Sequence, residues 1–133
     1  MTAKLSVSFI IRGFNCEPER ISELLSMKPT RSWRAGEAVP RTAMRRKENA
    51  WVLDSPLEDP MDIQPHIQWL LDALPPSLNS LAALTPGWHS TVFCAVYVDD
   101  ERPAINLEPA HVARIANLGA GIDIDLYSIA EHE

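Results

Sequence analysis

The sequence predicts an α+β domain in which helices cover one face of a single β-sheet, a two-layer α/β sandwich. Short segments with alternating or β-branched apolar residues are interleaved with segments whose apolar residues recur at helical spacing. Proline and glycine residues fall mostly near the boundaries between these segments. The chain has 133 residues, 46% of them hydrophobic, which fits one core and therefore a single domain over residues 1–133.

The first two elements are a strand and a short helix. Apolar residues alternate over residues 5–12, the period of a strand with one buried face, and Gly13 ends the run. Pro18 suits the first turn of a helix, where its missing N–H has no intrahelical acceptor to lose. Apolar residues then follow at helical spacing, so we expect this helix to continue until Pro29 stops it.

A long basic excursion separates the next two strands. Residues 30–34 have β-forming side chains and precede Gly36, which predicts a short strand and a turn. The charged residues 36–48 are expected to form a solvated basic loop or arm within the domain. Residues 50–54 form the next β-like run, which a Ser-Pro pair ends, so the two strands would form a hairpin with a long arm.

The second half of the chain supplies the remaining elements. Its periodicity and its Pro and Gly stops predict a helix over 62–74, a short helix over 77–84, a strand over 88–98, a helix over 108–118 and a strand over 122–127. Without the short helix the order is βαββαβαβ. Right-handed crossovers place the helices on one sheet face, which predicts a ferredoxin-like core with an extra helix and strand.

The chain carries no signature of export or of a membrane span. The apolar run that follows the first residues is too short for the core of a signal peptide. Arg, Asp, Glu or Pro interrupts every apolar stretch before it reaches about 18 residues. Cys16 and Cys94 lack a Cys-x-x-Cys spacing, so we expect reduced, buried thiols rather than a redox or zinc site. These features predict a soluble, cytoplasmic protein.

Charge is unevenly distributed along the chain. The net charge is −6, yet residues 28–47 hold seven basic residues and one acid, a local charge of +6 that leaves −12 elsewhere. This asymmetry predicts one electropositive face on an acidic body. Such a surface disfavours general nucleic-acid binding and permits a local contact with an anionic group or an acidic protein.

Several stretches of the sequence resemble one protein family. They are residues 30–37 with the sequence TRSWRAGE, Trp51, residues 122–127 with the sequence IDIDLY, the strand ending at Gly13, the helix start EPERI at residues 17–21, and the Leu70-Leu71 helix. On these motifs the chain resembles domain-of-unknown-function family 4279, a family of small bacterial proteins, over nearly its whole length. The resemblance implies one compact domain with no established activity, and it therefore supplies no catalytic residues.

The basic arm and two tryptophans form the candidate binding site. Guanidinium groups pair with oxyanions through two hydrogen bonds, and indole rings stack on planar groups. The candidate residues are Arg31, Trp33, Arg34, Gly36, Glu37, Arg41 and Trp51. In the alternative interpretation, the arm is only a solvated charge run and both tryptophans belong to the core. No glycine-rich nucleotide signature occurs, and we expect no cofactor.

Two other sets of residues have less support. Asp123 and Asp125 lie two apart, so on a strand both carboxylates face one side, where His89 or His111 would complete a hard-metal site. Their alternation with apolar neighbours is also typical of an ordinary solvent face, and we expect no metal. Cys16, beside a helix N-terminus, is the best candidate nucleophile but lacks a partner base, so no catalytic residue is predicted.

The sequence therefore favours a non-enzymatic bacterial binding domain. Its Arg/Trp arm would dock on an acidic protein partner or on another copy of the chain, with Trp33 as a buried anchor. The alternative is a small-molecule anion binder or an enzyme, in which Arg31, Arg34 and Arg41 clamp a carboxylate or phosphate in a pocket beside the arm. Neither hypothesis involves nucleic acid or a membrane.

Overall fold

A computed structural model describes residues 4–58, 61–76, 78, 87–98 and 102–128. Five strands and three helices alternate within this part of the chain: β1 (Lys4–Arg12), α1 (Pro18–Leu25), β2 (Arg31–Trp33), β3 (Ala50–Asp54), α2 (Ile63–Ala73), β4 (His89–Val98), α4 (Pro109–Asn117) and β5 (Gly121–Ser128). The short helix expected over residues 77–84 lies outside the described residues except for Leu78, which is buried. The predicted α+β class is confirmed.

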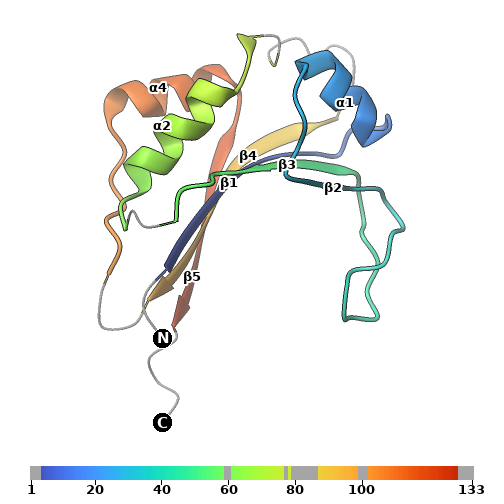
Figure 1. Cartoon of the computed structure of the whole chain (residues 1–133), viewed down its shortest axis with the longest axis horizontal. Coiled ribbons are helices and arrows are strands. Elements are labelled where there is room, and N and C mark those ends of the chain that lie inside the picture. Colours follow the sequence, from blue (N-terminus) through green and yellow to red (C-terminus); the bar gives the residue numbers. More distant parts are fainter. Residues whose placement is uncertain (1–3, 59–60, 77, 79–86, 99–101, 129–133) are drawn as a thin grey trace.

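The strands form one mixed sheet in the order β2-β3-β1-β4-β5. Neighbouring strands are antiparallel except for β4 and β5, which are parallel. A parallel pair needs a crossover connection, and α4 lies in the connection between these two strands. The strand β5 therefore lies at one edge of the sheet, and β2 lies at the other (Figure 1).

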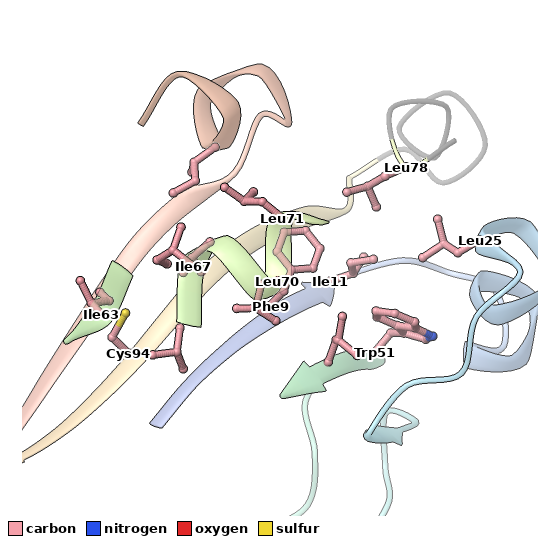
Figure 2. Packing of buried hydrophobic residues seen from close by; sticks show 14 of the residues in the cluster. Phe9, Ile11, Leu25, Trp51, Ile63, Ile67, Leu70, Leu71, Leu78 and Cys94 are labelled. Atoms are coloured by element: carbon pink, nitrogen blue, oxygen red, sulfur yellow. The ribbon is translucent and has the colours of Figure 1, made fainter. Parts of the chain in front are cut away.

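The core lies between one face of the sheet and the helices. Alternate residues of β1 point to this side, and Phe9 and Ile11 are fully buried there. All three helices contribute buried residues to the same hydrophobic cluster, so they cover the same face of the sheet. Figure 2 shows the side chains of β1, β3, β4 and α2 meeting in this layer, with the Trp51 indole among them. No helix in the described part of the chain is long and apolar enough to cross a membrane.

The end of α1 differs from the sequence prediction. The helix was expected to continue to Pro29, but it ends at Leu25. Ser26 adopts a left-handed conformation with φ of 53°, and its N–H and that of Met27 bond to the carbonyl oxygens of Glu23 and Ser22. These bonds satisfy the last carbonyl groups of the helix, so the chain turns before the proline is reached.

The opposite face of the sheet carries no helix among the described residues, and we call it the open face. It presents Arg31 and Trp33 at the β2 edge and Asp123 and Asp125 at the β5 edge. This follows from the register, because paired residues on neighbouring strands point to the same face and successive residues along a strand point to opposite faces. The segment that joins β2 to β3 extends away from the sheet at the β2 edge (Figure 1). Basic and acidic side chains therefore lie at opposite edges of one sheet.

Candidate functional site

The basic segment expected as a loop is folded on itself. We call residues 34–49 the basic hairpin. Gly36 N–H donates to the Arg46 carbonyl (2.8 Å), Arg46 N–H to the Glu37 carbonyl (2.8 Å) and Val39 N–H to the Met44 carbonyl (3.0 Å). Together with the antiparallel bridge between Ala38 and Arg45, these bonds define two short arms and a tip. The charged run is therefore a structured projection.

Arg34 fastens the base of the hairpin to the start of α1. Its Nε donates to Glu17 Oε1 (2.7 Å), and its Nη2 donates to Glu19 Oε1 (3.0 Å). Glu37 accepts the Arg34 backbone N–H (3.0 Å) and lies 3.7 Å from Nη1. The hydrogen bond to Glu17 and the negative charge of that residue raise the pKa of the Arg34 guanidinium above its ordinary value. This guanidinium is thus already paired within the chain.

Asn49 makes a second connection between the hairpin and the turn before α1. Its side-chain N–H groups donate to the carbonyl oxygens of Phe14 (2.8 Å) and Cys16 (3.2 Å), and its Oδ1 accepts the Ala35 N–H (2.8 Å). Asn49 was not among the residues predicted from the sequence. An asparagine between a charged run and a strand is ordinary in a loop, and its partners are distant in the sequence, so no local pattern indicates this role.

The half-buried Trp33 supports the hairpin from the open face. The guanidinium carbon of Arg46 lies 3.8 Å from the centre of a Trp33 ring, a cation–π contact. Arg45 Nη1 donates to the Gly36 carbonyl (3.0 Å). One face of the Trp33 ring is therefore occupied by the hairpin, and this residue contributes to the hairpin base.

Arg31 is paired in a similar way on β2. Its Nε and Nη2 donate to the two carboxylate oxygens of Asp54 on β3 (3.1 and 3.0 Å). The hydroxyl of Ser8 also donates to this carboxylate, and Asp54 N–H donates to Thr30 Oγ1 (2.8 Å). Such a fork-to-fork pair fixes the orientation of both side chains. Like Arg34, Arg31 has an internal partner for its guanidinium.

The hairpin tip, residues 39–45, is exposed. Met44 is 63% exposed, and Arg41 and Arg45 beside it are exposed as well. Thr42 stabilises the tip, because its Oγ1 donates to the Val39 carbonyl (2.9 Å) and accepts the Met44 N–H (3.0 Å). Arg41 has a left-handed backbone conformation with φ of 62°, which costs energy for a residue with a Cβ atom. An apolar side chain flanked by cations is typical of a protein contact.

Trp51 lies apart from the other predicted binding residues. It is fully buried, and its Nε1 donates to Ser22 Oγ of α1 (3.0 Å). Because Trp51 and Trp33 point to opposite faces of the sheet, the structure does not bring them together. Of the predicted set, Arg34, Gly36 and Glu37 form the hairpin base, together with Trp33, while Arg31 lies beside it and Arg41 is at the tip.

Three other residues considered from the sequence, Asp123, Asp125 and His111, have structural partners. Asp123 lies 4.0 Å from Arg12, and Asp125 accepts a hydrogen bond from the Tyr127 hydroxyl (3.3 Å). The ring nitrogens of the buried His111 contact the side-chain carbonyl oxygens of two glutamines of α2 (2.8 and 2.7 Å). Within the described residues, no three metal-ligating side chains gather at one place.

The two cysteines differ in their surroundings. Cys94 is fully buried on β4, and burial raises the pKa of its thiol to about 11. A thiol with this pKa is almost entirely protonated near neutral pH and is therefore a poor nucleophile. Cys16 is partly exposed and packs against the core. Both thiols are free.

The chain was compared with known proteins and families. No curated protein and no solved structure matches it. One family, described as a domain of unknown function, DUF4279, matches residues 3–129, which is nearly the whole chain. This match agrees with the resemblance of the TRSWRAGE and IDIDLY segments noted in the sequence. The protein therefore belongs to the DUF4279 family.

Proposed function

We propose that this protein is a non-enzymatic protein-binding domain whose basic hairpin docks on an acidic surface, either of a partner protein or of another copy of the chain. The observation that carries the proposal is the contrast between the two ends of the hairpin. Its base is fastened by Arg34, Asn49 and Trp33, whereas Met44 and the arginines around it are exposed at the tip. A preorganised projection loses less conformational freedom on binding than a mobile loop.

The tip supplies both kinds of contact that a docking element needs. Full burial of an exposed methionine side chain contributes about 1.5 to 3 kcal/mol, so Met44 is a better anchor than Trp33, whose ring is already covered by Arg46. Arg41 and Arg45 would mainly accelerate association with an acidic surface and fix its orientation. The strained conformation of Arg41 is consistent with a functional position.

The alternative of a small-anion clamp has less support. It requires the guanidinium groups of Arg31, Arg34 and Arg41 to converge on one carboxylate or phosphate. Arg31 is paired with Asp54, and Arg34 is paired with Glu17, Glu19 and Glu37. An anion would therefore have to displace carboxylates that already belong to the chain, so we favour the docking function.

Two finer assignments accompany this proposal. The strand order β2-β3-β1-β4, with α1 after β1 and α2 after β3, supports a ferredoxin-like core to which α4 and β5 are added. Two free cysteines support a reducing, cytoplasmic location. A net charge of −6 supports a protein partner rather than nucleic acid.

The proposal is tested with a fluorescent peptide in which glutamates alternate with leucines. Binding is measured by anisotropy at low and high salt for the wild type and for an Arg41→Glu, Arg45→Glu double variant. We expect binding by the wild type to weaken with salt and the variant to bind about tenfold more weakly or worse. The matched control, Arg20→Glu with Arg102→Glu, changes the net charge equally at exposed sites outside the hairpin.

The outcomes separate the hypotheses. If the hairpin variant and the control bind the peptide equally, and both self-associate like the wild type, the hairpin is not the docking element. If phosphate or a dicarboxylate instead raises the melting temperature of the wild type but not of the hairpin variant, the anion-binding alternative replaces docking.

A further inference from the structure

The edge strand β5 exposes an unusual number of apolar side chains. Ile122, Ile124, Leu126 and Tyr127 are among the exposed large hydrophobic residues of the described chain, and Leu126 reaches 68%. Every residue of β5 is exposed. The three aliphatic residues lie in one row on the helix-facing side, because their register partners on β4 all belong to the buried core.

Apart from the charges of Asp123 and Asp125, the sequence of β5 lacks the features that usually protect an edge strand. Residues 121–128, GIDIDLYS, contain no lysine and no proline, and the strand pairs with β4 in continuous register. Natural edge strands are commonly blocked by lysine, proline or a bulge, since their free backbone groups otherwise accept a further strand. The edge of β5 is therefore suited to strand addition.

The other side of β5 is acidic. Asp123 and Asp125 point to the open face and, two residues apart on a strand, have Cα atoms about 6.7 Å apart. Both are exposed. An incoming strand that fits this edge needs apolar side chains on one side and cations two residues apart on the other.

The basic hairpin supplies side chains of both kinds on its returning arm. Arg45 forms an antiparallel bridge with Ala38, so its side chain lies on the opposite side of the arm from those of Met44 and Arg46, and the cation Lys47 follows in a bend two residues further along. The backbone groups of Met44 and Arg46 form hydrogen bonds inside the hairpin. The backbone N–H and C=O of Arg45, which lies between them, therefore point toward the outer edge of the hairpin. The outward backbone groups of Arg45 and the positive charge of this segment are complementary to the free edge and the acidic side chains of β5.

We propose that residues 43–47 of one copy add to the β5 edge of a second copy. Met44 would cover the apolar row beside Ile124 and Leu126. Arg45 and Lys47 would pair with Asp123 and Asp125. This inference rests on the proposed docking function of the hairpin and identifies the acidic surface that it binds.

The positions of the two surfaces determine the kind of assembly. The hairpin and β5 lie at opposite edges of the sheet (Figure 1). The contact is therefore head-to-tail, and it leads to oligomers that grow with concentration or close into a ring. Symmetric pairing of two β5 strands about Ile124 is disfavoured, because it would place Asp123 opposite Asp125 of the second copy.

A charge-swap experiment tests the contact. Sedimentation velocity at low and high salt is applied to the wild type, to the hairpin variant Arg45→Glu, Lys47→Glu, and to the strand variant Asp123→Lys, Asp125→Lys. We expect salt-sensitive oligomers for the wild type and association about tenfold weaker or worse for each variant. Mixing the two variants, or combining all four substitutions in one chain, restores the oligomers because every contact regains opposite charges.

A control double variant reverses two acidic residues that lie away from β5. Glu23→Lys with Glu58→Lys makes the same charge change as the strand variant at exposed sites away from β5 and should associate like the wild type. Circular dichroism and thermal melts verify that each variant is folded. Monomeric wild type at all concentrations, or failure of the combined variant to recover, overturns the inference.

The pattern of effects shows which idea has failed. If hairpin reversal weakens self-association while strand reversal does not, the hairpin docks elsewhere, so the β5 site fails and the docking function stands. If strand reversal alone changes self-association, β5 pairs with itself and this inference is wrong. If wild type is monomeric and also ignores the acidic peptide, both proposals fail.

Discussion

Replacement of Trp51 by phenylalanine should destabilise the fold without affecting docking. The indole is fully buried, and its Nε1 donates to Ser22 Oγ at 3.0 Å. Phenylalanine removes about two buried ring carbons at roughly 0.8 kcal/mol each. It also removes one hydrogen bond with a net contribution of about 1 kcal/mol. The free energy of unfolding should therefore fall by about 2 to 3 kcal/mol.

The hydrogen bond can be isolated with Ser22→Ala. This substitution leaves the Trp51 N–H without its acceptor, so it should cost about 1 to 3 kcal/mol. In the double variant the bond is lost only once, and the combined loss should be smaller than the sum of the single losses by about 0.5 to 1.5 kcal/mol.

Urea unfolding, followed by far-ultraviolet circular dichroism, measures these differences in the free energy of unfolding. The comparison holds if the slope m, the dependence of this free energy on urea concentration, is the same for all variants. Anisotropy with the acidic peptide measures docking of the same proteins. The reasoning is refuted if Trp51→Phe keeps the stability of the wild type within about 0.5 kcal/mol but loses peptide binding, because the indole would then contribute to the binding surface rather than to the core.

Four further predictions follow from the pKa shifts of Cys94 and Tyr127 and from the contacts of the hairpin. Burial raises the pKa of Cys94 to about 11, so iodoacetamide should modify Cys16 but not Cys94 until the protein unfolds, as peptide mass spectrometry would show. Because the unfolded thiol loses its proton first, stability should fall as pH rises from about 9 toward 11. Arg34→Ala should speed hydrogen exchange of the hairpin amides, since it removes one of the connections between the hairpin and α1. Asp125→Asn should lower the pKa of Tyr127, which the charge of Asp125 raises, and phenolate absorbance during a pH titration reports it.

The labelling, hydrogen-exchange and tyrosine predictions each have a control variant. Cys16→Ser should abolish labelling of the folded protein, and equal labelling of both thiols would contradict the buried position of Cys94. Arg20→Ala breaks only an exposed pair within α1 and should leave exchange in the hairpin unchanged. Asp123→Asn should shift the tyrosine titration less than Asp125→Asn, because Asp125 is the carboxylate bonded to Tyr127.

Much of the fold was predictable because its elements carry strong local signals. Pro18 and Pro109 open helices in the structure as the sequence predicts. The alternation in β1 identifies the buried face of a central strand. The C-terminus of α1 was not predictable, because the residue that adopts the left-handed conformation is Ser26 and not a glycine, the usual signal for such an end.

The candidate site was predictable in position but not in detail. The run of basic residues located the hairpin, yet charge alone does not show which cations have partners, and Arg34 finds its acids on α1. The roles of the two tryptophans depend on strand register, and β2 is too short to show a period. The apolar alternation of β5 indicates a buried face, whereas its edge position leaves that face exposed.

The central position of β1 has a consequence for folding during synthesis. It emerges first among the described strands, yet it hydrogen-bonds to β3 on one side and to β4 on the other. At about 5 to 20 residues per second, roughly 4 to 17 s pass before β4 follows it out of the ribosome. Until then Phe9 and Ile11 lack their native surroundings, so the sheet should form only once β4 has emerged.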